Sequence, residues 1–142
     1  MIKYALLTLS ILFFIVPAYA GSALTFENAY AYPTSKVQKN GAVFVTVNNT
    51  TDTAQKIISA HSDIAERIEL HTHIMDGDVM MMREVEGYEI PANGNVTLDP
   101  MGHHIMLFGL NKQLMPGETF VLKIQTEQGE MYEFPVTVGD GS

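Results

Sequence analysis

Short apolar or alternating runs, separated by turn residues, make up most of the chain. Residues 41–49 (GAVFVTVNN) and 118–125 (ETFVLKIQ) are rich in β-branched and aromatic residues. In residues 130–138 (EMYEFPVTV), tyrosine, phenylalanine and valine stand at every second position. Both patterns are typical of β-strands with one buried face. We therefore predict strands in these three ranges.

Glycine, proline and asparagine divide the remaining chain at regular intervals. The TEQGE segment predicts a hairpin turn between the last two strands, and further breaks fall at NNTTDTA, DGD, PANGN and PMG. Nowhere does a capped helical period persist, although SDIAER (62–67) could form a single helical turn. This spacing favours an all-β, single-domain sandwich or small Greek-key barrel.

The N-terminal segment has the features of a secretory signal peptide. Lys3 precedes an almost wholly apolar run over residues 5–16, and residues 18–20 (AYA) form a small-x-small cleavage signal. The run is shorter than the roughly 20 residues needed to cross a bilayer. We expect residues 1–20 to be removed and 21–142 to form the mature domain, without a membrane span. An uncleaved anchor is the less favoured alternative.

Charge and cysteine content exclude several classes of protein. The full chain carries 16 acidic and 8 basic residues, a net charge of −8 that becomes −9 once Lys3 is removed. Such a surface repels phosphates, so a nucleic-acid partner is not expected. The chain has no cysteine. This excludes an electron-transfer cupredoxin, which needs a thiolate ligand, and leaves the core rather than disulfides to stabilise the domain.

Histidine and methionine are concentrated in one part of the sequence. All five histidines lie between positions 61 and 104, and six of the eight methionines after Met1 lie between 75 and 106. Because side chains alternate across a strand, Met81 and His103 should point away from their neighbours. The sets expected to share a face are His71, His73 and Met75; Met80 and Met82; and His104 and Met106.

The donor types indicate a soft metal ion. Neutral, polarizable thioethers favour Cu(I), whereas imidazole accepts Cu(I), Cu(II) or zinc, and calcium and magnesium prefer oxygen. A mixed histidine and methionine set without cysteine therefore suits Cu(I). The alternative is that the methionines only fill gaps in the core. Their concentration beside histidines favours the metal site.

The spacing of these residues resembles the signature of the periplasmic copper chaperones of the PCuAC family, H(M)-x10-M-x21-H-x-M. Ten residues separate His71 from Met82, twenty-one separate Met82 from His104, and Met106 completes H-x-M. The segments GHHIMLFGL and LMPGETFVLKIQTEQGE also look like the family. The resemblance extends from about residue 26 to residue 138.

The resemblance implies a cupredoxin-like β-sandwich with one Cu(I) at a surface site. Together with the predicted signal peptide, it leads us to expect a monomeric periplasmic copper chaperone rather than an enzyme. It also implies delivery of one Cu(I) toward the Cu-A site of cytochrome c oxidase, either to the subunit that bears this site or to an assembly factor. The metal ligands that it implies are His71, Met82, His104 and Met106.

His73 departs from the family, which often has methionine at this position. It is a further candidate ligand, because imidazole tolerates Cu(II) where thioether does not. On an extended strand it lies two residues, about 7 Å, from His71. We therefore expect both to reach one ion only if the strand ends at Thr72 and the DGD turn folds back. If His73 is not a ligand, it is a solvated residue at the rim of the site.

Other functions remain open at this point. A copper sequestration or tolerance protein, which would also bind Cu(II), needs the same ligands as a chaperone and differs only in its partners. A copper enzyme or zinc hydrolase would need an open coordination position and a nearby acid or base. The nearby Glu69, Asp76, Asp78 and Glu84 are explained as residues of turns and strand faces, so no catalytic group is predicted. An adhesion-type sandwich would not need the motif.

Overall fold

A computed structural model of the protein describes residues 22–142; the predicted signal peptide, 1–20, lies outside the described residues. All regular structure in this part of the chain is β-strand, and it contains no helix that could span a membrane. The strands are β1 Leu24–Ala31, β2 Asn40–Asn49, β3 Gln55–His61, β4 Ala65–Asp76, β5 Val79–Glu84, β6 Tyr88–Ile90, β7 Asn95–Leu98, β8 His104–Leu110, β9 Thr119–Thr126 and β10 Met131–Val138.

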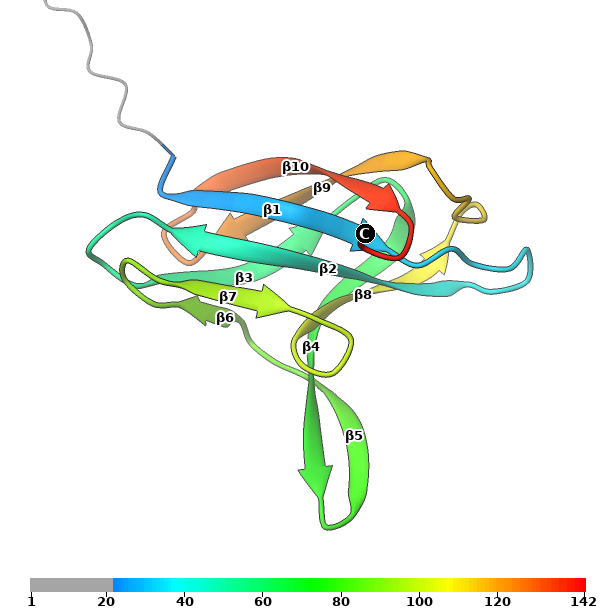
Figure 1. Cartoon of the computed structure of the whole chain (residues 1–142), viewed down its shortest axis with the longest axis horizontal. Helices are drawn as coiled ribbons and strands as arrows, with labels where there is room; N and C mark the ends of the chain where they lie inside the picture. Colours follow the sequence, from blue (N-terminus) through cyan, green and yellow to red (C-terminus); the bar gives the residue numbers. More distant parts are fainter. Residues whose placement is uncertain (1–21) are drawn as a thin grey trace, which may run out of the picture.

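The strands form one hydrogen-bonded sheet that folds over itself into two layers (Figure 1). Their order is β5-β4-β8-β2-β1-β10-β9-β3-β6, and β7 pairs with the part of β2 that β8 leaves free. Strands β1 and β10 are parallel, and the other pairs described in residues 22–142 are antiparallel. Strand β3 packs against β4. The predicted all-β, single-domain sandwich is thus confirmed.

The core lies between the two layers and is built from alternate residues of the predicted strands. In β10, Phe134 and Val136 are buried while the residues on either side of each are not. The three predicted strand ranges coincide with β2, β9 and β10 to within one or two residues. Gly129, with φ of 88°, lies in the predicted hairpin turn between β9 and β10. The suggested helical turn at 62–67 is absent, because β4 already begins at Ala65.

One hairpin projects from the sandwich (Figure 1). The first part of β4 pairs with β8 as far as His71, and beyond that residue β4 continues to Asp76 with β5 as its partner. Gly77, with φ of 63°, takes the positive-φ position that a two-residue hairpin turn requires. All six residues of β5 are exposed. The hairpin therefore depends on its connection to β8 for its orientation.

Candidate metal centre

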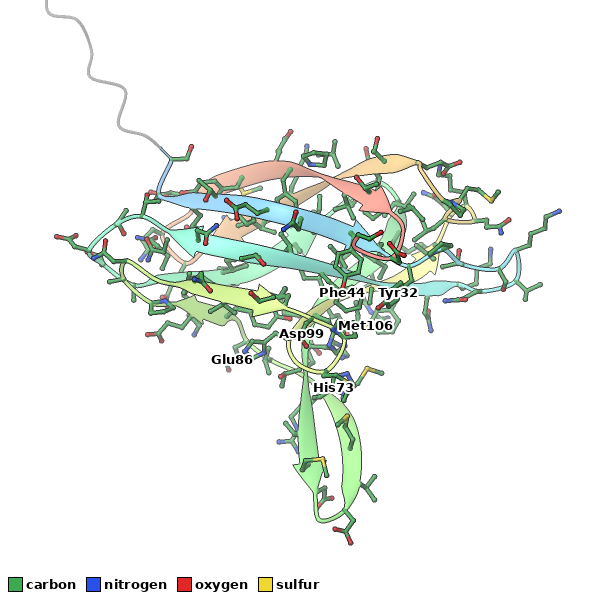
Figure 2. All side chains as sticks on the ribbon, viewed as in Figure 1. Tyr32, Phe44, His73, Glu86, Asp99 and Met106 are labelled. Atoms are coloured by element: carbon green, nitrogen blue, oxygen red, sulfur yellow. The ribbon has the colours of Figure 1, made fainter. Side chains whose placement is uncertain are left out.

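The pairing of β5, β4 and β8 brings the predicted donors to one face of the sheet. His71 lies directly opposite His104, His73 opposite Met82, and Glu69 opposite Met106. Directly opposite residues share a face. The predicted set His71, Met82, His104 and Met106 is therefore assembled on a single face at the base of the hairpin, where Figure 2 shows the labelled His73 and Met106. The other face of β4 and β8 is directed into the core.

Three imidazole rings lie close together at this base. The ring centroids of His71 and His104 are 5.8 Å apart, and those of His73 and His104 are 5.0 Å apart. The fold-back after Thr72, the stated condition for His71 and His73 to share one ion, does not occur, because β4 stays extended to Asp76. The histidine that His73 approaches is His104, the first residue of β8. The ring of His104 lies close to the rings of both His71 and His73.

Hydrogen bonding fixes which nitrogen of His104 is free to bind a metal. His104 is 2% exposed, and its Nδ1 lies 3.0 Å from the carbonyl oxygen of Gly102. Because a carbonyl only accepts, Nδ1 must carry the proton. Nε2 then presents a lone pair, and it is buried with no hydrogen-bond partner among residues 22–142. A buried, unpartnered acceptor costs stability in the apo protein and is ready to coordinate a cation.

His71 shows the complementary arrangement. Its Nε2 lies 2.8 Å from Glu69 Oε2, and Arg67 Nε lies 2.7 Å from the other oxygen of the same carboxylate. The His71 hydrogen bond, with Arg67 beside it, lowers the pKa of Glu69 below its usual range. The ionised carboxylate holds a proton on Nε2, leaving the Nδ1 lone pair, which is buried and unpartnered in the described chain. Carboxylate partners commonly orient metal-binding imidazoles in this way.

The turn before β8 fixes the position of the Gly102 carbonyl that bonds His104. Asp99 and Pro100 occupy the first two positions of a β-turn closed by the hydrogen bond from Gly102 N to Asp99 O, 3.1 Å. The Asp99 side chain accepts a second bond from the backbone of Met101. The carbonyl of Gly102 then accepts from His73 N as well as from the His104 ring. The turn thus connects two of the three histidines.

The hydroxyl of Tyr88 links β4 and β8, the two strands that bear His71 and His104. The side chain is buried, at 2% exposure, and its hydroxyl accepts a hydrogen bond from His71 N at 2.9 Å. The same hydroxyl lies within donating distance of the carbonyl oxygens of His71 and His104. Burial raises the pKa of Tyr88, so the hydroxyl keeps its proton. It occupies the point where the ladder between β4 and β8 ends and the hairpin departs.

The methionines are not core residues. None of the eight methionines between positions 22 and 142 is buried; Met82 is 53% exposed and Met106 is half-buried. The alternative in which they fill gaps in the core is therefore wrong. Met81 pairs with Ile74 on the opposite face of the hairpin from Met82, as the alternation predicted.

Burial also affects the ionisation of His104. Desolvation lowers its pKa, and the neighbouring histidines act in the same direction, against a smaller opposing effect of the Gly102 carbonyl. The neutral, metal-binding form is therefore favoured at lower pH than for an ordinary histidine.

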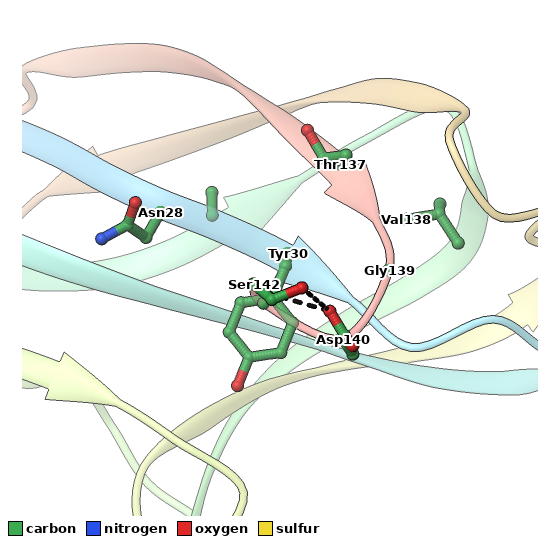
Figure 3. A pocket seen from close by; sticks show the side chains of 9 residues that line it. Asn28, Tyr30, Thr137, Val138, Gly139, Asp140 and Ser142 are labelled. Atoms are coloured by element: carbon green, nitrogen blue, oxygen red, sulfur yellow. Dashed lines mark hydrogen bonds between the residues drawn. The ribbon is translucent and has the colours of Figure 1, made fainter.

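In the described part of the chain, nitrogen and oxygen donors alone do not form a metal site. Within residues 22–142, no three histidine, cysteine, aspartate or glutamate side chains are close enough to hold a metal by themselves. A site on the hairpin face thus requires the thioethers, or a turning of the imidazole rings. The pocket in Figure 3 lies between β1 and residues 137–142, and neither histidine nor methionine lines it.

Sequence reasoning missed the contacts of Tyr88 and of Gly102. Tyr88 lies seventeen residues from His71 and sixteen from His104, so no local pattern relates them. The sequence marks residues 100–102 (PMG) only as a break between strands. For Glu69, the available signal was its position two residues before His71 on one strand face.

Comparison with known proteins places the chain among bacterial relatives. A family model described as putative lipoprotein LpqE-like matches residues 24–138. A putative lipoprotein of Leifsonia xyli subsp. xyli, Lxx21020, is 31% identical over 102 residues, which cover 71% of this chain and 61% of the relative. The uncharacterized protein RP573 of Rickettsia prowazekii is 33% identical over 106 residues, covering 71% and 58%. The chain thus spans about three fifths of the length of these relatives.

Solved structures share the fold. The copper-bound PCuAC domain from PmoF2 superposes with a TM-score of 0.71 at 17% identity, over 84% of this chain and 95% of that domain. The solution structure of CuI-DR1885 from Deinococcus radiodurans gives a TM-score of 0.63 at 29% identity, over 78% and 74%. The fold implied by the resemblance to the PCuAC family is therefore confirmed.

Proposed function

We propose that this chain, which belongs to the LpqE-like family, is a periplasmic copper chaperone that binds one Cu(I) through His71, Met82, His104 and Met106. It acts as a monomer after removal of residues 1–20 and passes the ion to a copper-accepting protein. The acceptor is the Cu-A-bearing subunit of cytochrome c oxidase or an assembly factor for it. The solved structure of DR1885 with Cu(I), a protein 29% identical to this chain, supports the choice of metal.

One observation carries this proposal: two imidazole nitrogens that are buried and have no hydrogen-bond partner in the described chain share a face of the sheet with two methionines. The free nitrogens are His71 Nδ1 and His104 Nε2, and Met82 and Met106 are on the same face of the sheet. Methionine side chains are long and flexible enough to turn toward an ion between the rings. Two neutral nitrogens and two soft sulfurs suit Cu(I) better than zinc or a hard cation.

The distribution of burial suits transfer as well as binding. The two imidazoles are held by hydrogen bonds at the sandwich, whereas Met82 is on the exposed strand of the hairpin. Thioethers are weak, uncharged donors. An acceptor thiolate can therefore approach from the exposed side and replace Met82 before it replaces the imidazoles.

Cu(I) binding is tested with methionine variants. The mature protein should bind about one equivalent of Cu(I) tightly, with sulfur visible by X-ray absorption, and Met82→Ala should weaken this binding about 10-fold or more. The apo melting temperature should hardly change, because Met82 is exposed; a core methionine would cost roughly 2–5 kcal/mol. Met81→Ala, on the opposite face, is the matched control. Tighter binding of zinc than of Cu(I), or a shell without sulfur, would contradict the assignment.

Delivery and sequestration are distinguished in cells. A strain lacking the gene should lose cytochrome oxidase activity at limiting copper and recover it when copper is added. The gene encoding the Met82→Ala variant should restore the strain poorly, and the Met81→Ala gene should restore it fully. A sequestration protein gives the other result: unchanged oxidase activity and greater sensitivity to excess copper. That result would replace the chaperone proposal with copper tolerance.

A second coordination mode concerns Cu(II). The ring of His73 lies near that of His104, and its Nδ1 is buried without a partner in the described chain. Turning the rings toward a common point would give the three nitrogens of His71, His73 and His104 to one ion, a harder donor set that suits Cu(II). This mode is expected particularly if the protein serves in copper tolerance.

A further inference from the structure

A pair of methionines at the outer end of the hairpin is not used by the site described above. Met75 in β4 lies directly opposite Met80 in β5, on the same face as His73, Met82 and the buried imidazoles. Met75 is 61% exposed and Met80 is 46% exposed. Two large apolar side chains exposed side by side gain nothing from the core. Core packing therefore does not explain why two methionines are paired at this tip, and we look for a ligand or partner that they could bind.

The Met75–Met80 pair is the outermost of a series of paired donors. Proceeding inward along the face, the next pair is His73 with Met82, followed by His71 with His104. Successive pairs are two residues apart along β4, which is about 7 Å. The methionines of the two outer pairs are exposed, and His104 in the innermost pair is buried. Sulfur or imidazole donors therefore follow one another from the exposed tip of the hairpin to the predicted site.

Building on the proposed function, we propose that Met75 and Met80 form a second, thioether-only Cu(I) site through which the ion enters and leaves the inner site. Directly opposite residues have Cβ atoms about 4.5–5.5 Å apart, and the three rotatable bonds of methionine let both sulfurs reach one ion. Two neutral sulfurs hold Cu(I) but not hard cations. With two donors against four, this outer site is the weaker of the two.

The charges at the tip also favour a cation. Asp76 ends β4 and Asp78 lies in the turn that joins the two strands, and the chain carries a net charge of −8. Acidic groups near an entry point raise the local concentration of positive ions. The two carboxylates do not need to coordinate the metal, since Cu(I) prefers sulfur to oxygen.

The test follows the methionine methyl groups by NMR while the mature protein is titrated anaerobically with Cu(I). The first equivalent should shift the methyl signals of Met82 and Met106. The second should shift those of Met75 and Met80 and leave Met81, Met115 and Met131 unchanged. The double variant Met75→Leu, Met80→Leu should bind about one equivalent instead of about two. Leucine preserves volume and hydrophobicity, so the hairpin should remain folded.

Met81→Leu, on the same hairpin but the opposite face, is the matched control and should retain both binding steps. A second equivalent that shifts Met81 as much as Met75, or that persists in the double variant, would overturn the outer site. So would a single binding step in the wild type; the tip would then be an apolar contact for a protein partner. If only Met75 and Met80 respond, the outer site stands and the inner site of the proposed function fails.

Discussion

Replacing His104 with asparagine should reduce the affinity for Cu(I) by more than about 100-fold, beyond the 10- to 100-fold typical of losing an outer hydrogen-bond partner. Asparagine can keep the bond to Gly102 O, since its amide nitrogen takes the place of His104 Nδ1. It removes only the free nitrogen, Nε2. Competition with a chromophoric Cu(I) chelator measures the change. A loss of less than 10-fold would show that His104 is not a ligand.

His73→Met is the matched comparison. It should preserve Cu(I) binding and weaken Cu(II) binding, whereas His104→Asn should weaken both, because the ring of His104 lies close to each of the other two rings. Electron paramagnetic resonance of the Cu(II)-loaded proteins provides the readout. Unchanged nitrogen couplings in His73→Met would exclude His73 as a ligand.

The same His104 variant has a signature in the apo protein. Because burial lowers the folded-state pKa of His104, the unfolded chain takes up this proton at a higher pH, near 6.5. The contribution of neutral His104 to the free energy of unfolding is therefore fully present above about pH 6.5. This contribution is lost as the pH falls toward the folded-state pKa. The wild type should lose stability on mild acidification, and His104→Asn should lose less. Equal slopes in the two proteins would contradict the buried, neutral histidine.

Tyr88→Phe should destabilise the apo protein by about 1–3 kcal/mol, the typical cost of leaving buried polar groups unsatisfied. The lost hydroxyl bonds His71 N and the carbonyls of His71 and His104. Without it, the two strands that bear the imidazoles are no longer tied at that point. We therefore also expect Cu(I) affinity to fall about 10-fold or more, in the range found for outer-shell partners.

The two effects of Tyr88→Phe separate a structural role from a positioning role. Affinity should be compared well below the melting temperature, where both proteins are folded. A lower melting temperature with unchanged affinity would mean that Tyr88 only stabilises the core. Tyr132→Phe is the matched control, because its hydroxyl bonds the exposed Glu130 at the protein surface; it should change neither property appreciably.

Alternation along strands accounts for most of what the sequence predicted. It placed His71 and His73 on one face, and Met82 apart from Met81, because the period of a strand fixes side-chain direction without any tertiary information. Turn residues likewise located the hairpin at Gly129. The all-β sandwich follows from such local signals repeated along the chain.

The arrangement between strands could not be predicted in the same way. Nothing local in the sequence indicates that β8 stops pairing with β4 at His71, or that Tyr88 fills the gap. The fold-back considered after Thr72 does not occur, because a DGD turn limits where a strand ends but does not bend the strand before it. Proximity of His73 to His104 arises from the pairing of distant strands, which depends on the whole core.

Strand β5 has consequences for the lifetime of the complex. It forms the end of the sheet, its six residues are exposed, and it pairs with β4 alone. Segments of this kind open locally at a free-energy cost far below that of global unfolding. Met82, one of the proposed ligands, therefore lies on a segment that can open locally, while His71 and His104 stay attached to the core. In the proposed copper complex, the residence time of the ion is governed by local opening of the hairpin, so a chain that resists heat can still release Cu(I) quickly.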